Sequence, residues 1–124
     1  MSDAAKVMPM PPTPPKWGVQ KDYFIDYRKK KPEDHKPVEI SVGLQDSIIW
    51  WCERKFRVLS VHPDYDRSPD APTPLFYREF PEDDREFSFF VISGPARPGT
   101  ENNYYKPVFE FEDRTTLDPH IHTT

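Results

Sequence analysis

The fold is decided by the stretch "DSIIWWCERKF", Asp46 to Phe56, which holds two of the three tryptophans and the single cysteine. Side chains alternate between the two faces of a β-strand, so each face of "SIIWWC" (47–52) carries apolar residues. One face carries Ile48, Trp50 and Cys52, and the other carries Ile49 and Trp51. A strand that is apolar on both faces is typical of the centre of a covered sheet, in which Cys52 is a small buried hydrophobe.

Further strands are predicted on either side of this stretch. The charged residues "ERK" (53–55) predict a hairpin turn, and "FRVLSV" (56–61) predicts the strand that returns from it. Before it, "VEISV" (38–42) has the alternating pattern of a half-buried strand, and Gly43 permits a turn. Four more strands are predicted at 75–80, 85–93, 104–112 and 117–122, with long loops at 62–74 and 94–103.

Composition supports an all-β fold. Sixteen prolines and four glycines in 124 residues argue against helices, because a proline inside a helix removes a hydrogen bond and clashes with the preceding turn. About seven short strands at this spacing are typical of a single antiparallel β-sandwich. The sequence therefore predicts one β-sandwich domain at 38–124, preceded by an extended, proline-rich N-terminal arm at 1–37.

The predicted arm contains the proline-rich segment "PMPPTPPKW" (9–17), which is expected to be extended as polyproline II. An aromatic cluster and a basic run (28–31) follow, either as a short helix that Pro32 ends or as a disordered leader. Large aromatic rings are costly to leave in water. We therefore expect the arm to dock on its own domain, on a neighbouring copy or on a partner protein. The residues expected to make this contact are Trp17, Tyr23, Phe24 and Tyr27.

Charge and composition also restrict the partners. Residues 1–37 carry eight Lys/Arg and five Asp/Glu, a net charge of +3, whereas residues 38–124 carry nine and sixteen, a net charge of −7. An acidic domain repels phosphate backbones, so nucleic acid is not expected as a partner. No apolar run has the length of a signal peptide or a membrane span, so we expect a cytoplasmic protein without membrane contact. A single cysteine forms no internal disulfide.

The stretch "VEISVGLQDSIIWW" (38–51) resembles the early part of cupredoxin-like β-sandwich domains, and "FSFFVISGP" and "YYKPVFEFEDRTTLDPHI" look like their last strands. The resemblance covers roughly residues 38–122, and an immunoglobulin-like sandwich has much the same pattern. The copper site of the cupredoxin family does not carry over. That site uses two histidines, a late cysteine and usually a methionine, but Cys52 comes early and all three methionines lie in the arm.

Two histidines near the C-terminus form the clearest candidate metal site. His120 and His122 are two residues apart, so on a strand they project from the same face, and His62 is a candidate third ligand from another part of the chain. This set supports an alternative function as a metal-binding cupredoxin-like domain.

Signals for catalysis are absent from the sequence. A catalytic Cys52 would need a base oriented towards its thiol, and no such partner is apparent. The chain has no phosphate-binding loop, nucleotide fingerprint or serine elbow. We therefore expect a non-enzymatic binding or assembly module without a cofactor, which acts through a protein partner or through self-association into a homo-oligomer.

Overall fold

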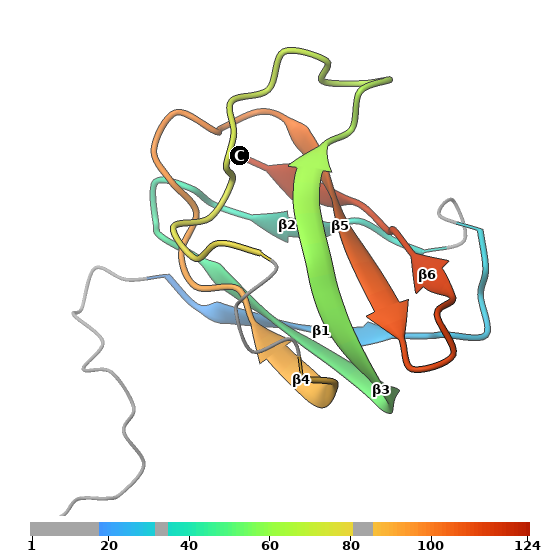
Figure 1. Ribbon diagram of the computed structural model, residues 1–124. Helices are drawn as coiled ribbons and strands as arrows, with labels where there is room; N and C mark the ends of the chain where they lie inside the picture. Colours follow the sequence, from blue (N-terminus) through green and yellow to red (C-terminus); the bar gives the residue numbers. More distant parts are fainter. Residues whose placement is uncertain (1–17, 32–34, 81–85) are drawn as a thin grey trace, which may run out of the picture.

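The computed structural model describes residues 18–31, 35–80 and 86–124 of the protein. These residues form seven strands and no helix, so the prediction of an all-β fold is confirmed (Figure 1). The strands are β1 (Gln20–Ile25), β2 (Val38–Ile40), β3 (Ser47–Pro63), β4 (Ser88–Ile92), β5 (Tyr104–Phe111), β6 (Thr116–Leu117) and β7 (Ile121–Thr123). No helix long and apolar enough to cross a membrane occurs in the part of the chain that the structure describes.

The strands belong to one nearly closed sheet, whereas the sequence predicted an antiparallel sandwich. Their order is β1-β3-β5-β7-β2, with β4 paired to β3 and β6 paired to β5. The pairs β1/β3 and β2/β7 are parallel, and the other pairs are antiparallel. The sheet is therefore mixed. The apolar pattern of a strand specifies which face is buried, but it does not specify the direction of the neighbouring strand.

The central strand β3 is continuous, so the hairpin turn predicted at 53–55 is wrong. Figure 1 shows β3 (green) bending sharply part-way along its length. Residues 47–52 pair with β1 and β4, whereas residues 56–63 pair with β5, and the pairing with β4 shifts register between Trp51 and Phe56. A bulge of this kind bends a strand without ending it, which accommodates the charged residues.

The segment 75–80 was predicted as an edge strand, but it forms only one isolated bridge, between Phe76 and Ala96. The prolines before it remove ladder donors, and it is held instead by single backbone bonds to the loop 94–103, such as that from the Arg97 N–H to the Leu75 carbonyl (2.7 Å). Leu75 and Phe76 are nevertheless fully buried, so this segment contributes to the core although it is not a strand.

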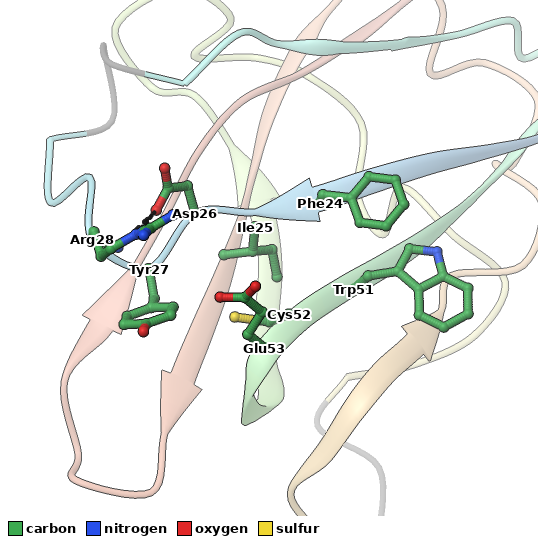
Figure 2. A pocket seen from close by; sticks show the side chains of 8 residues that line it. All are labelled: Phe24, Ile25, Asp26, Tyr27, Arg28, Trp51, Cys52 and Glu53. Carbon is green, nitrogen blue, oxygen red and sulfur yellow. Dashed lines mark hydrogen bonds and ion pairs between the residues drawn. The ribbon is translucent and has the colours of Figure 1, made fainter.

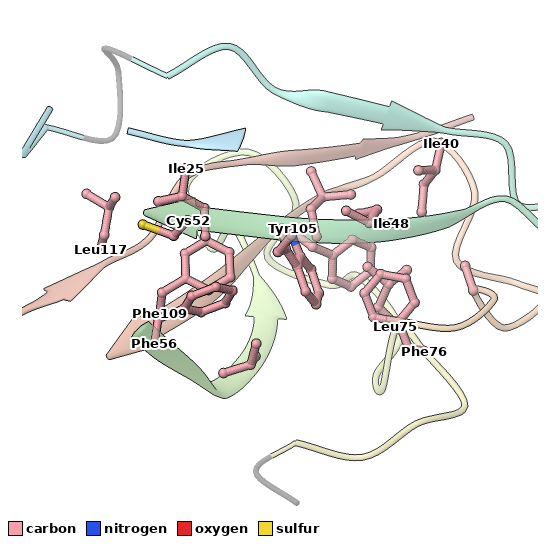
Figure 3. Close-up of a cluster of buried hydrophobic side chains, with 14 of the residues drawn as sticks. Ile25, Ile40, Ile48, Cys52, Phe56, Leu75, Phe76, Tyr105, Phe109 and Leu117 are labelled. Carbon is pink, nitrogen blue, oxygen red and sulfur yellow. The ribbon is translucent and has the colours of Figure 1, made fainter. Parts of the chain in front are cut away.

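The core is built from aromatic rings that meet edge to face (Figure 3). Trp50 contacts Phe109 with ring centroids 5.5 Å apart, and Phe56 contacts the same ring at 5.4 Å. All three side chains are completely buried. Pairs with this geometry each contribute roughly 0.5–1.5 kcal/mol beyond the burial of their area. Cys52 lies on the same side of β3 and is buried, as predicted.

The first and last strands of the sheet order meet at Asp46. Its carboxylate accepts hydrogen bonds from the backbone N–H of Val19, which precedes β1 (3.1 Å), and from that of Ser41, which follows β2 (2.9 Å). Gly18 lies against this carboxylate. We call this contact the Asp46 junction. It connects β1 and β2 through a side chain where no strand ladder joins them.

Candidate functional site

A row of three aromatic residues crosses the outer face of the sheet. In the strand register, Phe24 of β1 lies opposite Trp51 of β3, and Trp51 lies opposite Phe90 of β4. The rings of Phe24 and Trp51 have centroids 6.3 Å apart and planes 17° apart, and those of Trp51 and Phe90 are 5.2 Å and 34° apart. We call Phe24, Trp51 and Phe90 the aromatic row.

The aromatic row is open to solvent although it is held in place. The side chain of Phe24 is 72% exposed and that of Phe90 is 48% exposed. The indole Nε1–H of Trp51 donates a hydrogen bond to Asp22 Oδ1 (3.0 Å), which fixes the central ring. The outward face of a half-covered sheet normally carries polar residues, so a fixed apolar strip on it is characteristic of an interaction surface.

A pocket of about 460 Å³ adjoins the row, where β1 ends and β3 begins to bend (Figure 2). The residues that line it are Phe24, Ile25, Asp26, Tyr27, Arg28, Trp51, Cys52 and Glu53. Its volume lies in the range of small-ligand and side-chain pockets. In the view of Figure 2, Glu53 lies between Tyr27 on one side and Trp51 on the other.

Tyr27 is a fixed wall of this pocket. Its ring meets that of Phe111 edge to face, with centroids 6.5 Å apart. The guanidinium of Arg54 lies 5.1 Å from both ring centroids and also forms an ion pair with Asp113 at 3.0 Å. These contacts hold Tyr27 from several directions, so the shape of the pocket is established before any partner binds.

The two carboxylates of the pocket differ in their surroundings. Asp26 accepts hydrogen bonds from the side-chain Nε–H and the backbone N–H of Arg28, both at 3.1 Å, and these bonds lower the pKa of Asp26. The side chain of Glu53 is exposed and forms no hydrogen bond or ion pair with the side chains of the described residues. The pocket therefore carries one carboxylate that is bound to Arg28 and one, Glu53, that acts on the same guanidinium through its charge alone.

The residues predicted to bind a partner lie in different places. Trp17 lies outside the described residues. Tyr23 and Tyr27 pack against the core of their own domain, and burial raises the pKa of Tyr23 to about 12. Phe24 points outward into the aromatic row. The last part of the predicted arm thus supplies strand β1 of the sheet, and neither a short helix nor a leader is present at 20–25.

Sequence reasoning missed Trp51, Phe90 and Glu53 as surface residues of the site. The available signal was the pairs of consecutive aromatic residues, such as "WW" (50–51) and "FF" (89–90). Two aromatic residues in succession on a strand must place one ring on each face. One ring of each pair therefore lies on the outer face of the sheet.

The three candidate metal ligands have separate partners. His120 is buried, with its Nε2 3.4 Å from Asp64 Oδ2. His122 stacks on Tyr104 with centroids 4.4 Å apart, and His62 stacks on Tyr65 at 5.5 Å. Within residues 18–31, 35–80 and 86–124, no group of three or more His, Cys, Asp or Glu side chains is arranged to hold a metal ion. The structure does not gather the histidines around a common centre.

The burial of His120 predicts a pH dependence of stability. Burial, helped by the positive charges of Lys106 and Arg67, lowers the pKa of His120 below its ordinary value of about 6.5. The unfolded chain then binds a proton at this histidine more readily than the folded protein does. The contribution of His120 to stability is therefore fully present above about pH 6.5 and is lost as the pH falls through the lowered pKa. We expect His120→Gln to reduce the loss of unfolding free energy between about pH 7.5 and about pH 5. Denaturant titrations at both pH values measure this, and equal losses in the two proteins would contradict it.

Comparisons with known proteins leave the site as the basis for assigning a function. The sequence matches no protein-family model, and searches of curated proteins and of solved structures give no significant match. The cupredoxin-like and immunoglobulin-like resemblances therefore stay predictions.

Proposed function

We propose that the protein is a non-enzymatic binding and assembly module, in which the aromatic row receives an extended segment from a neighbouring copy of the chain. The observation that supports this most directly is the exposure of Phe24 and Phe90 on either side of a fixed Trp51. Covering an exposed ring with apolar groups contributes roughly 1–2 kcal/mol, so a partner that covers the row gains several kcal/mol from this surface.

The stacking of the row favours an extended protein segment over a nucleic acid. The rings already stack on one another at 5.2 and 6.3 Å, which leaves no space for a base between them. The carboxylates of Asp22 and Glu53 lie close to the row and repel phosphates. A ridge of aromatic rings is instead the kind of surface on which proline-rich segments pack.

The chain itself contains a segment with this chemistry. Residues 9–17, "PMPPTPPKW", favour an extended polyproline II conformation, which loses little conformational entropy when it binds. The segment precedes Gly18, which lies just before β1 begins at Gln20, whereas Phe24 lies six residues beyond Gly18, about 20 Å away. To reach its own row, the segment would have to reverse direction at once. A neighbouring copy presents it without that reversal, and two copies can exchange segments symmetrically.

Additional observations support a role without catalysis. Burial raises the pKa of the Cys52 thiol, which works against the thiolate that a nucleophile requires. Two acidic residues, Asp26 and Glu53, line the pocket together with Cys52. The carboxylate of Asp26 is bound to Arg28.

The test is the concentration dependence of the native mass, measured by light scattering on the full chain. We expect wild type to self-associate and Phe24→Ser to weaken the association constant at least about tenfold, because the substitution removes an exposed apolar ring. Tyr77→Ala is the matched control, since Tyr77 is a 58% exposed aromatic residue outside the row and the pocket.

Two outcomes would overturn the proposal. Wild type that stays monomeric at all concentrations would exclude assembly through a neighbouring copy. Equal self-association of wild type and Phe24→Ser would place the contact elsewhere on the molecule.

A further inference from the structure

Strand β4 has one edge that no described strand covers. Among the residues that the structure describes, β4 pairs only with β3, and in Figure 1 it lies at the margin of the sheet (orange). Its sequence, "SFFVI" (88–92), contains no charged residue and no proline. Charged side chains and proline are two of the devices that normally prevent an edge strand from pairing with another chain. This edge is therefore suited to the addition of a further strand.

The backbone groups of Phe90 point towards this open edge. The Ser93 N–H donates a hydrogen bond to a carbonyl of β3 (2.8 Å). In an antiparallel pair, residues bonded to the partner strand alternate with residues whose backbone groups point away from it. Val91 therefore faces β3, whereas Phe90 and Ile92 face the open side. The hydrogen bond that the Arg78 side chain donates to the Ile92 carbonyl agrees with this direction.

We infer that the open edge of β4 pairs antiparallel with the same edge of a second copy of the chain, an inference that rests on the proposed function. A two-fold axis through this pairing places Phe90 opposite its equivalent in the second copy. The N–H of each Phe90 then donates to the carbonyl of the other. The two sheets become continuous across the contact between the copies.

The charges at the two ends of β4 favour a second copy, in antiparallel orientation, as the added strand. Glu86 is exposed just before β4 begins, and the guanidinium of Arg78 lies at the other end, beside Ile92. Antiparallel pairing brings the beginning of each strand to the end of the other. Glu86 of each copy therefore approaches Arg78 of the other, whereas parallel pairing would bring the two glutamates together.

The same pairing joins two aromatic rows into one strip. Phe90 is the ring of the row that lies on β4, and it is 48% exposed. Aromatic side chains directly opposite one another on antiparallel strands contact each other. The two Phe90 rings therefore meet, and the row of each copy continues into the row of the other. This strip gives the exchanged segments one continuous surface.

Amide hydrogen exchange of the full chain, followed by NMR below and above the concentration at which it associates, tests the pairing. We expect exchange at the Phe90 amide to slow at least about tenfold on association, because its N–H becomes hydrogen-bonded. The Val91 amide faces β3 within each copy, so its exchange is slow at both concentrations and serves as the internal control.

Substitutions at position 90 separate the backbone from the ring. Phe90→Ala removes only the ring, whereas Phe90→Pro also removes the N–H. We expect Phe90→Pro to weaken self-association at least about tenfold more than Phe90→Ala, measured by light scattering. A segment that only covers the face of the row loses the same ring in both variants. Proline is tolerated on an edge strand where the N–H points outward, and slow exchange at Val91 checks that the sheet is intact.

The outcomes separate this inference from the proposed function. If Phe24→Ser weakens association but the Phe90 amide exchanges equally fast at both concentrations, the row binds a neighbour and the inference about β4 fails. Equal association of folded Phe90→Pro and Phe90→Ala, or a Phe90 amide that is already protected in the monomer, would also overturn it. If Phe90→Pro does not fold, the exchange of wild type decides. If wild type does not associate at any concentration, the proposed function itself fails.

Discussion

We expect Gly18→Ala to lower the free energy of unfolding by about 2–4 kcal/mol. A Cβ atom at position 18 would lie 1.9 Å from Asp46 Oδ1, 2.6 Å from the Leu44 carbonyl oxygen and 2.8 Å from the Asp46 backbone nitrogen. Two of these atoms belong to the backbone and cannot move aside cheaply. The substitution must therefore displace β1 or break the hydrogen bonds of the Asp46 junction, including that from the Val19 N–H.

Urea unfolding of Gly18→Ala and of Gly43→Ala provides the measurement with its control. A Cβ atom at Gly43 has no neighbour within 4 Å, so alanine there is expected to change stability by less than about 0.5 kcal/mol. If Gly18→Ala is as stable as Gly43→Ala, the close approach of the chain to Asp46 is not a feature of the folded protein.

Phe109→Ala is expected to destabilise the protein by about 3–5 kcal/mol. The ring is completely buried and contacts both Trp50 and Phe56 edge to face, so its removal leaves a cavity among aromatic rings that cannot close around it. Phe24→Ala removes a ring of the same kind that is 72% exposed, and we expect it to cost less than about 1 kcal/mol.

Thermal and urea unfolding of the two variants, together with light scattering, separate the core from the aromatic row. Phe109→Ala should lose stability, whereas Phe24→Ala should lose self-association while keeping most of its stability. A large stability loss in Phe24→Ala would show that the row belongs to the core and would remove its interpretation as a binding surface.

The sequence predicted the parts of the fold that depend on local alternation. The strand predicted at 104–112 is present as β5, in which buried and half-buried residues alternate from Tyr104 to Phe111. The inward face of β3 was also predicted, since Ile48, Trp50 and Cys52 are all buried. In both cases, each residue's position in the alternation determines whether it meets the core or water.

The remaining features depend on contacts that are distant in the sequence. Residues 20–25 become a strand only because β3 offers an edge for parallel pairing, and their own pattern beside the basic run does not indicate one. The exposure of Phe24 and Phe90 depends on what covers the outer face of the sheet, which no local pattern specifies. The candidate site lies at this face and was therefore only partly predicted, through Phe24 and Tyr27.

The parallel pairs of the sheet determine when the chain can fold during its synthesis. Strand β1 leaves the ribosome before its partner β3, which begins only at Ser47, and β2 pairs with β7 through the register Val38 to Ile121. Such a high contact order makes folding slow, because long loops must close before any of these contacts form. The sheet is therefore completed after translation has passed residue 121, and the aromatic residues of β1 remain without their partners until β3 has been made.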